Sequence, residues 1–351
     1  MASIREVAKK AGVSIATVSR VMNGHHTVAE HLRVRVLNAA KACDYNPHGT
    51  KSGASTIGLL YTKDFYLNSP YDSAVFAGMS DAMRHSQYDL VLLDLARDRR
   101  QEETFKQFFA RKRVGGAIVR SAYEQRDLLL EMAGEDLPMV VLGDHFQHES
   151  LKFVYSDSRE ASREAIDYLI AMGHKKIAFV QCERDDGDHI DRMNAYREGL
   201  EAEGLYDESR VYRVPPFRMD GVPLARRLLT KSDRPTAIFI ADPMVTVGIV
   251  NECTRLGVRI PEDISIVGFD DTDTRHMLCP RVTAVCQDSR QIGEKAFEAV
   301  RELMEGKSEG EAPATPPEAW FEIHESTGTA PESVKAVHTN NVSPRTPGAT
   351  R

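Results

Sequence analysis

Cysteine is scarce in this chain of 351 residues, and its five cysteines form no Cys-x-x-Cys pair. Neither a disulfide framework nor a zinc site is therefore predicted, and a reducing compartment is expected. No run approaches the roughly 20 apolar residues that a membrane span requires, and the charged N-terminal stretch lacks the apolar core of a secretion signal. We therefore expect a cytoplasmic protein that does not contact the membrane.

Sequence motifs of catalytic sites are also missing. The chain has no Gly-x-Ser-x-Gly elbow, no Gly-Lys-Ser/Thr phosphate loop and no clustered metal ligands. The acidic run 184–191 lacks the spacing of a calcium loop, and the pair His145 and His148 is typical of a surface turn. We interpret the acidic run as a solvated loop. The sequence thus predicts no enzymatic activity, no cofactor and no metal site.

Charge is distributed unevenly along the chain. Residues 1–56 contain eight Lys/Arg and three Asp/Glu, a net charge of +5, whereas the whole chain carries −7. The remainder therefore carries −12. A basic N-terminal head on an acidic body fits a head that contacts phosphate and a body that does not. The length predicts more than one domain.

The basic head contains a stretch, residues 5–23, that predicts two short helices. Apolar residues recur at helical spacing before Gly12, which allows the positive φ of a tight turn. Ser14 is suited to cap a second helix, whose apolar stripe is Val18, Val21 and Met22. Two helices joined in this way are typical of a helix-turn-helix, although an ordinary helical hairpin has the same spacing.

A third helix is predicted before Tyr45-Asn46-Pro47, because the residue before a proline is disfavoured in a helix. The expected core of this head is Val7, Ala8, Val18, Val21, Leu32 and Val36. Residues 48–55 contain two glycines and no large apolar side chain, which indicates a flexible linker.

From Thr56 onwards the pattern changes to alternating strands and helices. Strands that are apolar throughout, such as Ala237–Ile240, favour parallel sheets covered on both faces. Eleven strands are expected, which is too many for one comfortable doubly wound sheet, so two lobes are predicted. The predicted strands are residues 56–62, 89–96, 114–121, 137–144, 153–157, 176–182, 210–215, 237–241, 264–270, 283–287 and 320–324.

The chain resembles the lactose-repressor (LacI/GalR) family of bacterial transcription regulators over roughly residues 3–328. The head segment IREVAKKAGVSIATVSRVMNG is similar to that family's head almost throughout. The body carries further signatures of the family in the same order: AMGHKKIAFV, RMNAYREGL, PTAIFIADPMVTVGIV, IPEDISIVGFDDT, VTAVCQDSRQIGEKA and HESTG.

The resemblance implies an all-α helix-turn-helix head and an α/β periplasmic-binding-protein-like body of two doubly wound parallel-sheet lobes. It also implies a homodimer on double-stranded operator DNA, with a small sugar-like effector bound between the lobes. The expected parts are a head (1–47), a linker (48–56), a body (57–328) and a disordered tail (329–351). Within the body, the lobe next to the head would comprise residues 57–156 and 289–317, and the distal lobe residues 160–284 and 319–328.

In the head, the resemblance places base readers at Ile15, Ala16 and Arg20. Arg20 can donate two hydrogen bonds to guanine, although a solvated helix charge is the simpler interpretation. The expected phosphate contacts are Ser14, Thr17, Ser19, Asn23 and His25, and a polar turn is the alternative for His25.

The linker departs from the family pattern. Members usually carry an Ala-Arg-x-Leu hinge helix that wedges leucines into the minor groove. Here the segment between Pro47 and Ile57 is shorter, and it contains no leucine and no Ala-Arg pair. Gly49 and Gly53 further disfavour a helix. We therefore expect the hinge helix to be absent.

In the body, the resemblance implies effector-binding residues after the buried strands, where the carboxyl ends of parallel strands form ligand sites. Arginine and aspartate there can bind vicinal hydroxyls or a carboxylate, although Arg192 and Asp242 could instead form an interlobe ion pair. Tyr71 follows Phe65 and Tyr66, and these rings could stack on a sugar or simply cap the lobe. The expected effector-binding residues are Tyr71, Asp144, Arg192, Asp242 and Gln287.

These features together predict a sequence-specific DNA-binding repressor, cytoplasmic and associated with the nucleoid, whose operator affinity depends on a carbohydrate effector. The alternative is a periplasmic-type small-molecule binding protein, and the basic head argues against it.

Overall fold

The computed structural model describes residues 3–22, 28–43, 45, 55–62, 67–121, 123–183, 186–307, 317–333 and 336. Contacts divide the chain into two units. The first comprises Met1–Phe65, Ala77–Val154 and Gly293–Thr315, and the second comprises Tyr66–Phe76, Tyr155–Ile292 and Pro316–Arg351. No helix within the described ranges is long and apolar enough to cross a membrane.

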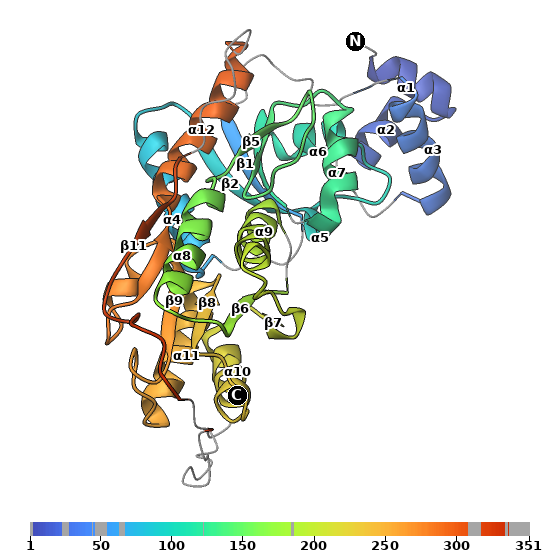
Figure 1. Ribbon diagram of the computed structural model, residues 1–351. Coiled ribbons are helices and arrows are strands. Elements are labelled where there is room, and N and C mark those ends of the chain that lie inside the picture. Colours follow the sequence, from blue (N-terminus) through green and yellow to red (C-terminus); the bar gives the residue numbers. More distant parts are fainter. Residues whose placement is uncertain are drawn as a thin grey trace. The chain divides into compact units, whose positions relative to one another are not determined.

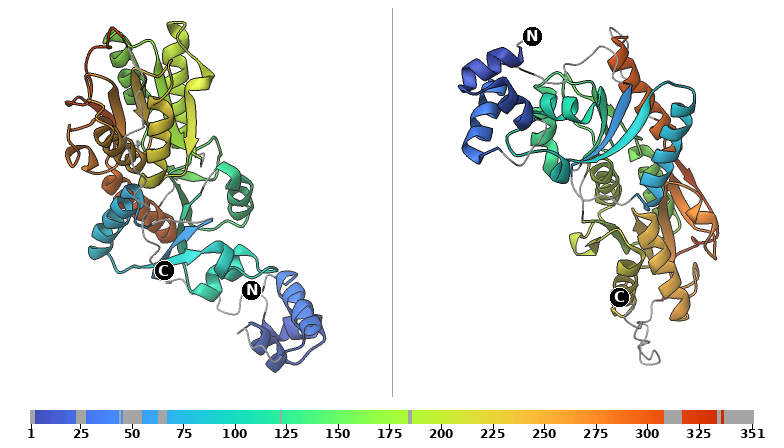
Figure 2. Two further views of the ribbon diagram at one scale, coloured as in Figure 1. Left: turned by 90° about the horizontal axis from the view of Figure 1, so that it is seen from below. Right: turned by 180° about the vertical axis from the view of Figure 1, so that it is seen from behind.

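The N-terminal head consists of helices α1 (Ile4–Ala11), α2 (Ile15–Met22) and α3 (Glu30–Lys41). They pack together as one small bundle, dark blue in both views (Figure 2). Ser3 and Glu6 form a capping box that starts α1, because each side chain accepts a hydrogen bond from the backbone of the other. The three helices enclose a core of valines, alanines and Met22.

One residue of the expected head core lies elsewhere. Val7, Val18, Val21 and Val36 are fully buried, but Leu32 is only partly buried and does not belong to the packed cluster. The buried face of α3 is formed by Val36, Ala39 and Ala40, and Leu32 lies in the first turn, where this stripe ends. Helix α3 therefore contributes Val36 and two small alanines to the head core, and not the expected Leu32.

The first unit contains a five-stranded parallel sheet of strand order β2-β1-β3-β4-β5. Leu60, Val119 and Val141 from three of its strands pack with Phe105 and Phe108 of α6. The strands are β1 (Thr56–Tyr61), β2 (Asp89–Asp94), β3 (Gly116–Arg120), β4 (Met139–Leu142) and β5 (Lys152–Val154). Its helices are α5 (Leu95–Asp98), α6 (Phe105–Lys112) and α7 (Arg126–Ala133), with the 3₁₀ turn η1 (Tyr123–Gln125). Helices α4 (Pro70–Arg84) and α12 (Ser289–Glu305) each begin in the second unit and end in the first.

The second unit contains a six-stranded sheet of strand order β11-β10-β9-β8-β6-β7. Strand β11 runs antiparallel to β10, and the other pairs are parallel. The strands are β6 (Ile177–Cys182), β7 (Val211–Val214), β8 (Ala237–Ile240), β9 (Ser265–Asp270), β10 (Thr283–Cys286) and β11 (Trp320–Glu322). Its helices are α8 (Arg159–Ala171), α9 (Gly187–Ala202), α10 (Arg218–Leu229) and α11 (Pro243–Arg255), with the 3₁₀ turns η2 (Glu208–Arg210) and η3 (Thr274–His276).

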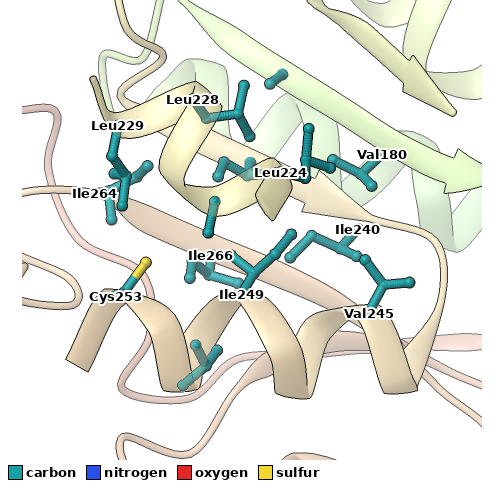
Figure 3. Close-up of a cluster of buried hydrophobic side chains, with 14 of the residues drawn as sticks. Val180, Leu224, Leu228, Leu229, Ile240, Val245, Ile249, Cys253, Ile264 and Ile266 are labelled. Carbon is teal, nitrogen blue, oxygen red and sulfur yellow. The ribbon is translucent and has the colours of Figure 1, made fainter. Parts of the chain in front are cut away.

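Helices cover both faces of this second sheet, because successive strand residues point to opposite sides. Ile238 and Ile240 of β8 face α10 and α11, where Leu224 and Ile249 meet them (Figure 3). Ala237 and Phe239 of the same strand pack instead with the side chains of α8 and α9. The uniformly apolar strands thus have the doubly covered arrangement that the sequence predicts.

Each of the eleven expected strands overlaps one strand of the structure. Figure 1 shows the labelled elements coloured in the order of the sequence. The structure confirms the predicted fold class, an all-α head followed by two parallel-sheet lobes with helices. Most of the expected linker, residues 48–54, lies outside the described residues, as do 334–335 and 337–351 of the expected tail. Ala330 of that tail donates its backbone N–H to the carbonyl of Met172 at 2.8 Å.

A buried histidine joins three segments of the second unit. His174 Nδ1 lies 2.9 Å from Thr236 Oγ1, and its Nε2 lies 3.1 Å from Ser265 Oγ and 3.0 Å from the carbonyl of Gly328. Burial lowers the pKa of His174 from its ordinary value of 6.5, against a smaller raising contribution from the Gly328 carbonyl. The folded state therefore favours the neutral imidazole.

The free energy of unfolding should consequently fall as the pH drops below about 6.5, because the unfolded state then binds more protons than the folded state. Urea unfolding of the parent and of His174→Gln at pH 7.5 and 5.5 measures this contribution. The variant should lose less stability between the two pH values than the parent. Equal losses in both proteins would show that His174 does not cause the dependence.

Candidate nucleic-acid interface and effector site

The turn between α1 and α2 is held by contacts between the end of α1 and helix α3. Gly12 ends α1 with φ +62°, the left-handed conformation that favours glycine. Arg35 of α3 donates from Nη2 to the carbonyl of Ala11 at 2.7 Å. A Cβ at position 12 would lie 2.8 Å from the same nitrogen. The third helix therefore fixes the geometry of the turn.

Ser14 caps α2, as the sequence predicts. Its Oγ accepts the backbone N–H of Thr17 at 3.1 Å, and the two hydroxyls lie 2.9 Å apart. The cap satisfies one of the free N–H groups at the start of the helix. Both hydroxyls are thereby placed at the helix N-terminus, where the helix dipole favours an anion such as a phosphate.

Helix α2 has an apolar buried face and an exposed face of mixed chemistry. Val18 and Val21 are completely buried, whereas Ile15 is 46% exposed and Ala16 and Arg20 are also exposed. A large aliphatic side chain on the surface of so small a bundle contributes nothing to its core. The three expected base readers are thus accessible to a partner.

The remaining expected phosphate contacts are not all exposed, and two of them are not described by the structure. Thr17 and Ser19 are partly buried. Asn23 and His25 lie outside the described residues. The first turn of α2 contains no acidic residue, so nothing on that turn opposes the approach of a phosphate.

Three of the expected effector-binding residues lie at the carboxyl edge of the second sheet or on the helix beside it. Asp242 follows β8, Gln287 follows β10, and Arg192 lies on α9. Because β6, β8, β9 and β10 are parallel, the residues that follow them meet at one edge.

Arg192 is buried within the second unit with part of its hydrogen-bonding capacity unused. It is 5% exposed, its Nη1 donates to the carbonyl of Ala241 at 3.1 Å, and its guanidinium carbon lies 3.4 Å from the ring centroid of Phe269. Its Nε has no hydrogen-bond acceptor among the residues that the structure describes. A buried charged donor without a partner is unusual and is consistent with a ligand site.

Gln287 and Asp271 lie at the same carboxyl edge of the second sheet and are hydrogen-bonded to each other. Gln287 Nε2 donates to Asp271 Oδ1 at 2.5 Å, and Ser289 Oγ donates to the same oxygen at 3.3 Å. Gln287 Oε1 is buried and accepts no hydrogen bond from any residue in the described ranges. Burial raises the pKa of Asp271 to about 6, although Arg192 and Gln287 both act to lower it.

Asp242 serves partly as a structural cap. Its Oδ1 accepts the backbone N–H of Val245 at 2.7 Å and starts α11, and Cys182 Sγ lies 3.4 Å from its Oδ2. Within the described part of the chain Arg192 and Asp242 form no ion pair, and both belong to the second unit. The interlobe ion pair considered from the sequence is therefore wrong.

Asp144 lies in the first unit and is already paired. Its carboxylate is fully buried and accepts hydrogen bonds from Arg126 Nε at 3.1 Å and Nη2 at 2.7 Å. Arg126, which sequence reasoning missed, lies 18 residues away on α7. Tyr71 lies in the first turn of α4 and is partly buried, and Phe65 and Tyr66 lie outside the described residues.

The acidic run 184–191 is not the solvated loop that the sequence favoured. Arg184 and Asp185 lie outside the described residues, but Asp186, Asp188 and Asp191 are buried. Asp186 caps α9 by accepting the N–H of His189 at 3.0 Å, and Asp191 pairs with Arg159 at 2.5 Å. The sequence alone did not predict this burial of acidic side chains. The free N–H groups at the start of α9 bind one carboxylate, and an arginine distant in sequence neutralises another.

Two models of known protein families match separate parts of the chain. Residues 3–48 match the model of bacterial regulatory proteins of the lacI family, and residues 166–327 match a periplasmic binding protein-like domain. The transcriptional repressor PurR of Vibrio atlanticus is 30% identical over 317 residues, which span 88% of this chain and 93% of PurR.

Two solved structures have a similar fold. A complex of the transcriptional regulator CelR with cellobiose has a TM-score of 0.66 and 25% identity, over 93% of this chain and 100% of that one. The lac repressor dimer bound to operator and the anti-inducer ONPF has a TM-score of 0.65 and 22% identity, over 93% of this chain and 99% of that one. The identity to PurR along nearly its whole length, the matched head and the two parallel-sheet lobes show that this chain belongs to the LacI family of DNA-binding transcriptional repressors.

Proposed function

We propose that this protein is a cytoplasmic homodimeric repressor whose affinity for one operator sequence changes when a sugar-like effector binds Arg192, Asp271 and Gln287. The observation that carries the effector proposal is that two buried polar atoms, Arg192 Nε and Gln287 Oε1, have no hydrogen-bond partner among the residues that the structure describes. The first is a donor and the second an acceptor. A ligand with hydroxyl groups can accept from the donor and donate to the acceptor, whereas a carboxylate cannot donate and an apolar ligand can do neither.

Sugars present several such hydroxyl groups, and the buried Asp271 carboxylate can accept further hydrogen bonds from them. The CelR structure, which holds cellobiose, supports a carbohydrate as the ligand class. Asp242 would contribute through its Oδ2, since its Oδ1 is used by α11. Asp144 and Tyr71 remain candidates for further contacts.

In the head, we propose that Arg20 reads a base pair and that Ser14 and Thr17 contact phosphate. Arg20→Ala should weaken operator binding by about 10- to 100-fold, because one bidentate arginine–guanine pair contributes about 1–3 kcal/mol of discrimination. Binding to random duplex at the same salt concentration should fall much less. Electrophoretic mobility shift on an operator selected from genomic fragments measures both affinities, with and without added sugars.

Lys41→Ala is the matched control for Arg20→Ala, since it removes the same charge from an exposed position on α3. It should leave the ratio of operator to random-duplex affinity unchanged. Equal losses of both affinities in Arg20→Ala would make Arg20 a phosphate contact. Failure of the parent protein to retard any fragment specifically would refute the proposed repressor function.

A further inference from the structure

Two histidines and a glutamate meet in the second unit, apart from the effector-binding residues. His276 ends the turn η3, Glu322 ends β11, and His324 follows two residues later. One ligand atom from each of these side chains lies within 4.8 Å of the other two. Glu322 and His324 are two residues apart on extended chain, so both can face the same side, towards η3.

The two oxygens of Glu322 have different partners. Oε2 accepts from Arg275 Nε at 2.9 Å, whereas Oε1 lies 3.1 Å from His324 Nε2 and 4.0 Å from His276 Nε2. The imidazole rings are 5.0 Å apart and steeply inclined, at 74°. One carboxylate oxygen and two imidazole nitrogens therefore converge on one point, while Arg275 orients the carboxylate from its other side.

The residues around this cluster are held in place by other contacts. The backbone N–H of His324 donates to Thr283 Oγ1 at 2.9 Å, and Thr283 Oγ1 donates to the His324 carbonyl at 3.1 Å. Glu322 pairs with Ala284 in the sheet. Arg275 also binds Asp270 at 2.9 Å, so its charge is shared between two carboxylates. The cluster thus retains negative charge that a cation can offset.

We propose that His276, Glu322 and His324 bind a divalent transition-metal ion, with Zn²⁺ the best fit to this ligand set. Two imidazole nitrogens and one carboxylate oxygen are ligands that zinc prefers, and three protein ligands leave a fourth position open for water. In a tetrahedral zinc site, bonds of about 2.0–2.1 Å place the ligand atoms about 3.3 Å apart. The separations from Glu322 Oε1 to the two histidines, 3.1 and 4.0 Å, lie on either side of this value, and the two histidine nitrogens lie within 4.8 Å of each other, so side-chain movements of about 1 Å bring all three to a common ion.

Arg275 and Thr283 would then be the outer partners that orient the ligands, as in many zinc sites. The sequence predicted no metal site here because the ligands come from segments far apart in the chain and show no ligand spacing. A bound ion would link η3, which directly follows the Asp270-Asp271 pair, to the edge strand β11.

The test is isothermal titration of the metal-stripped full-length protein with Zn²⁺ alone. We expect one saturable ion per chain with a dissociation constant at or below about 1 µM. His276→Ala and Glu322→Gln should each weaken binding by about tenfold or more, and the double variant His276→Ala/His324→Ala should abolish it. Circular dichroism of each variant without metal verifies that it remains folded, and Glu322→Gln keeps the shape of the side chain.

Two controls separate this site from other zinc-binding side chains. Cys279→Ser removes an exposed thiol three residues from His276, and His148→Ala removes a histidine outside the cluster. Both variants should bind Zn²⁺ as the parent does, and Co²⁺ in the parent should show no thiolate charge-transfer band. Absence of saturable binding, or binding that survives in the folded double histidine variant, would overturn the proposal.

Discussion

Replacing Gly248 by valine should prevent the second unit from folding, and Gly248→Ala should lower the free energy of unfolding by about 3 kcal/mol or more. A Cβ at position 248 of α11 would lie 2.1 Å from the carbonyl oxygen of Arg218 on α10. A Cβ at Gly221 would lie 2.6 Å from the carbonyl oxygen of Val245. Both obstructing atoms belong to the backbone, so no side-chain rotation can relieve the overlap.

The cost in Gly248→Ala therefore comes from moving one helix away from the other. Alanine is the better helix former by about 1 kcal/mol, but this gain is smaller than the loss of packing around Leu224 and Ile249. Without the close approach of the two glycines, α10 and α11 could not both cover the same face of the sheet at their present separation (Figure 3).

Urea unfolding followed by circular dichroism measures the effect of Gly248→Ala. Gly134→Ala is the matched control, because its Cβ would lie 3.5 Å from the carbonyl oxygen of Glu131, an ordinary contact, at negative φ. The control should unfold like the parent or slightly later. A loss below about 0.5 kcal/mol in Gly248→Ala would show that α10 and α11 do not approach so closely in solution.

Asp271→Asn should make the protein more stable at neutral pH while removing its response to the effector. Burial raises the pKa of Asp271 to about 6, so the carboxylate is ionised at pH 7 at a cost to the folded state. Asparagine keeps an oxygen that can accept from Gln287 and Ser289 but carries no charge. Loss of the favourable interaction with Arg192 opposes the gain, but the raised pKa shows that desolvation is the larger effect.

The sign of the pH dependence follows from the same shift. The pKa of Asp271 is about 6 in the folded protein and 3.8 in the unfolded chain. The folded state therefore binds the proton more tightly, and the free energy of unfolding is higher at low pH and falls as the pH rises from about 3.8 towards about 6. Relative to the parent, Asp271→Asn should therefore gain up to about 3 kcal/mol at pH 7 and little near pH 4, since the pKa is raised from 3.8 to about 6 and one pKa unit corresponds to about 1.4 kcal/mol. Urea unfolding across this range measures the difference.

Asp270→Asn provides a neighbouring control with the opposite expected result. Asp270 accepts backbone N–H groups of Thr274 and Arg275 and pairs with the Arg275 side chain at 2.9 Å. Its loss should destabilise the protein at pH 7 by about 1–3 kcal/mol. A gain in stability in both variants, or a loss in both, would show that the two carboxylates do not differ as described.

A thermal-shift screen against a carbohydrate library tests the functional half of the Asp271 prediction. A sugar present at 100 times its dissociation constant should stabilise the parent by about 2.7 kcal/mol. Asp271→Asn should show no such stabilisation with the same sugar. An unchanged shift in the variant would exclude Asp271 from the effector site but leave its effect on stability standing.

Local patterns were sufficient to predict most of the fold. The apolar run of β8 indicated a strand covered on both faces, and the order Gly12, Ser14, Val18 indicated the turn and the cap of the head. These features depend on residues a few positions apart, so spacing along the chain describes them fully. Leu32 was misplaced because the end of a buried stripe depends on which neighbouring helix reaches it.

The details of the candidate sites depend on partners that are distant in sequence, which spacing cannot identify. The carboxylate of Asp144 is neutralised by Arg126, and Asp191 is paired with Arg159 from α8. Adjacent aspartates 270 and 271 look equivalent in the sequence, yet one caps a turn and the other is buried beside Gln287. Only the three-dimensional arrangement separates these roles.

Because helix α2 separates its buried residues from its exposed ones, the exposed residues can change in evolution without changing the core of the head. Val18, Val21 and Met22 hold the helix in the bundle, while Ile15, Ala16 and Arg20 are exposed and lie outside the packed core of the head. Exchanging the outward residues therefore leaves the folding free energy almost unchanged. Under the proposed base-reading role of these positions, duplicated copies of this gene could acquire new target sequences by drift there, without first passing through an unstable intermediate.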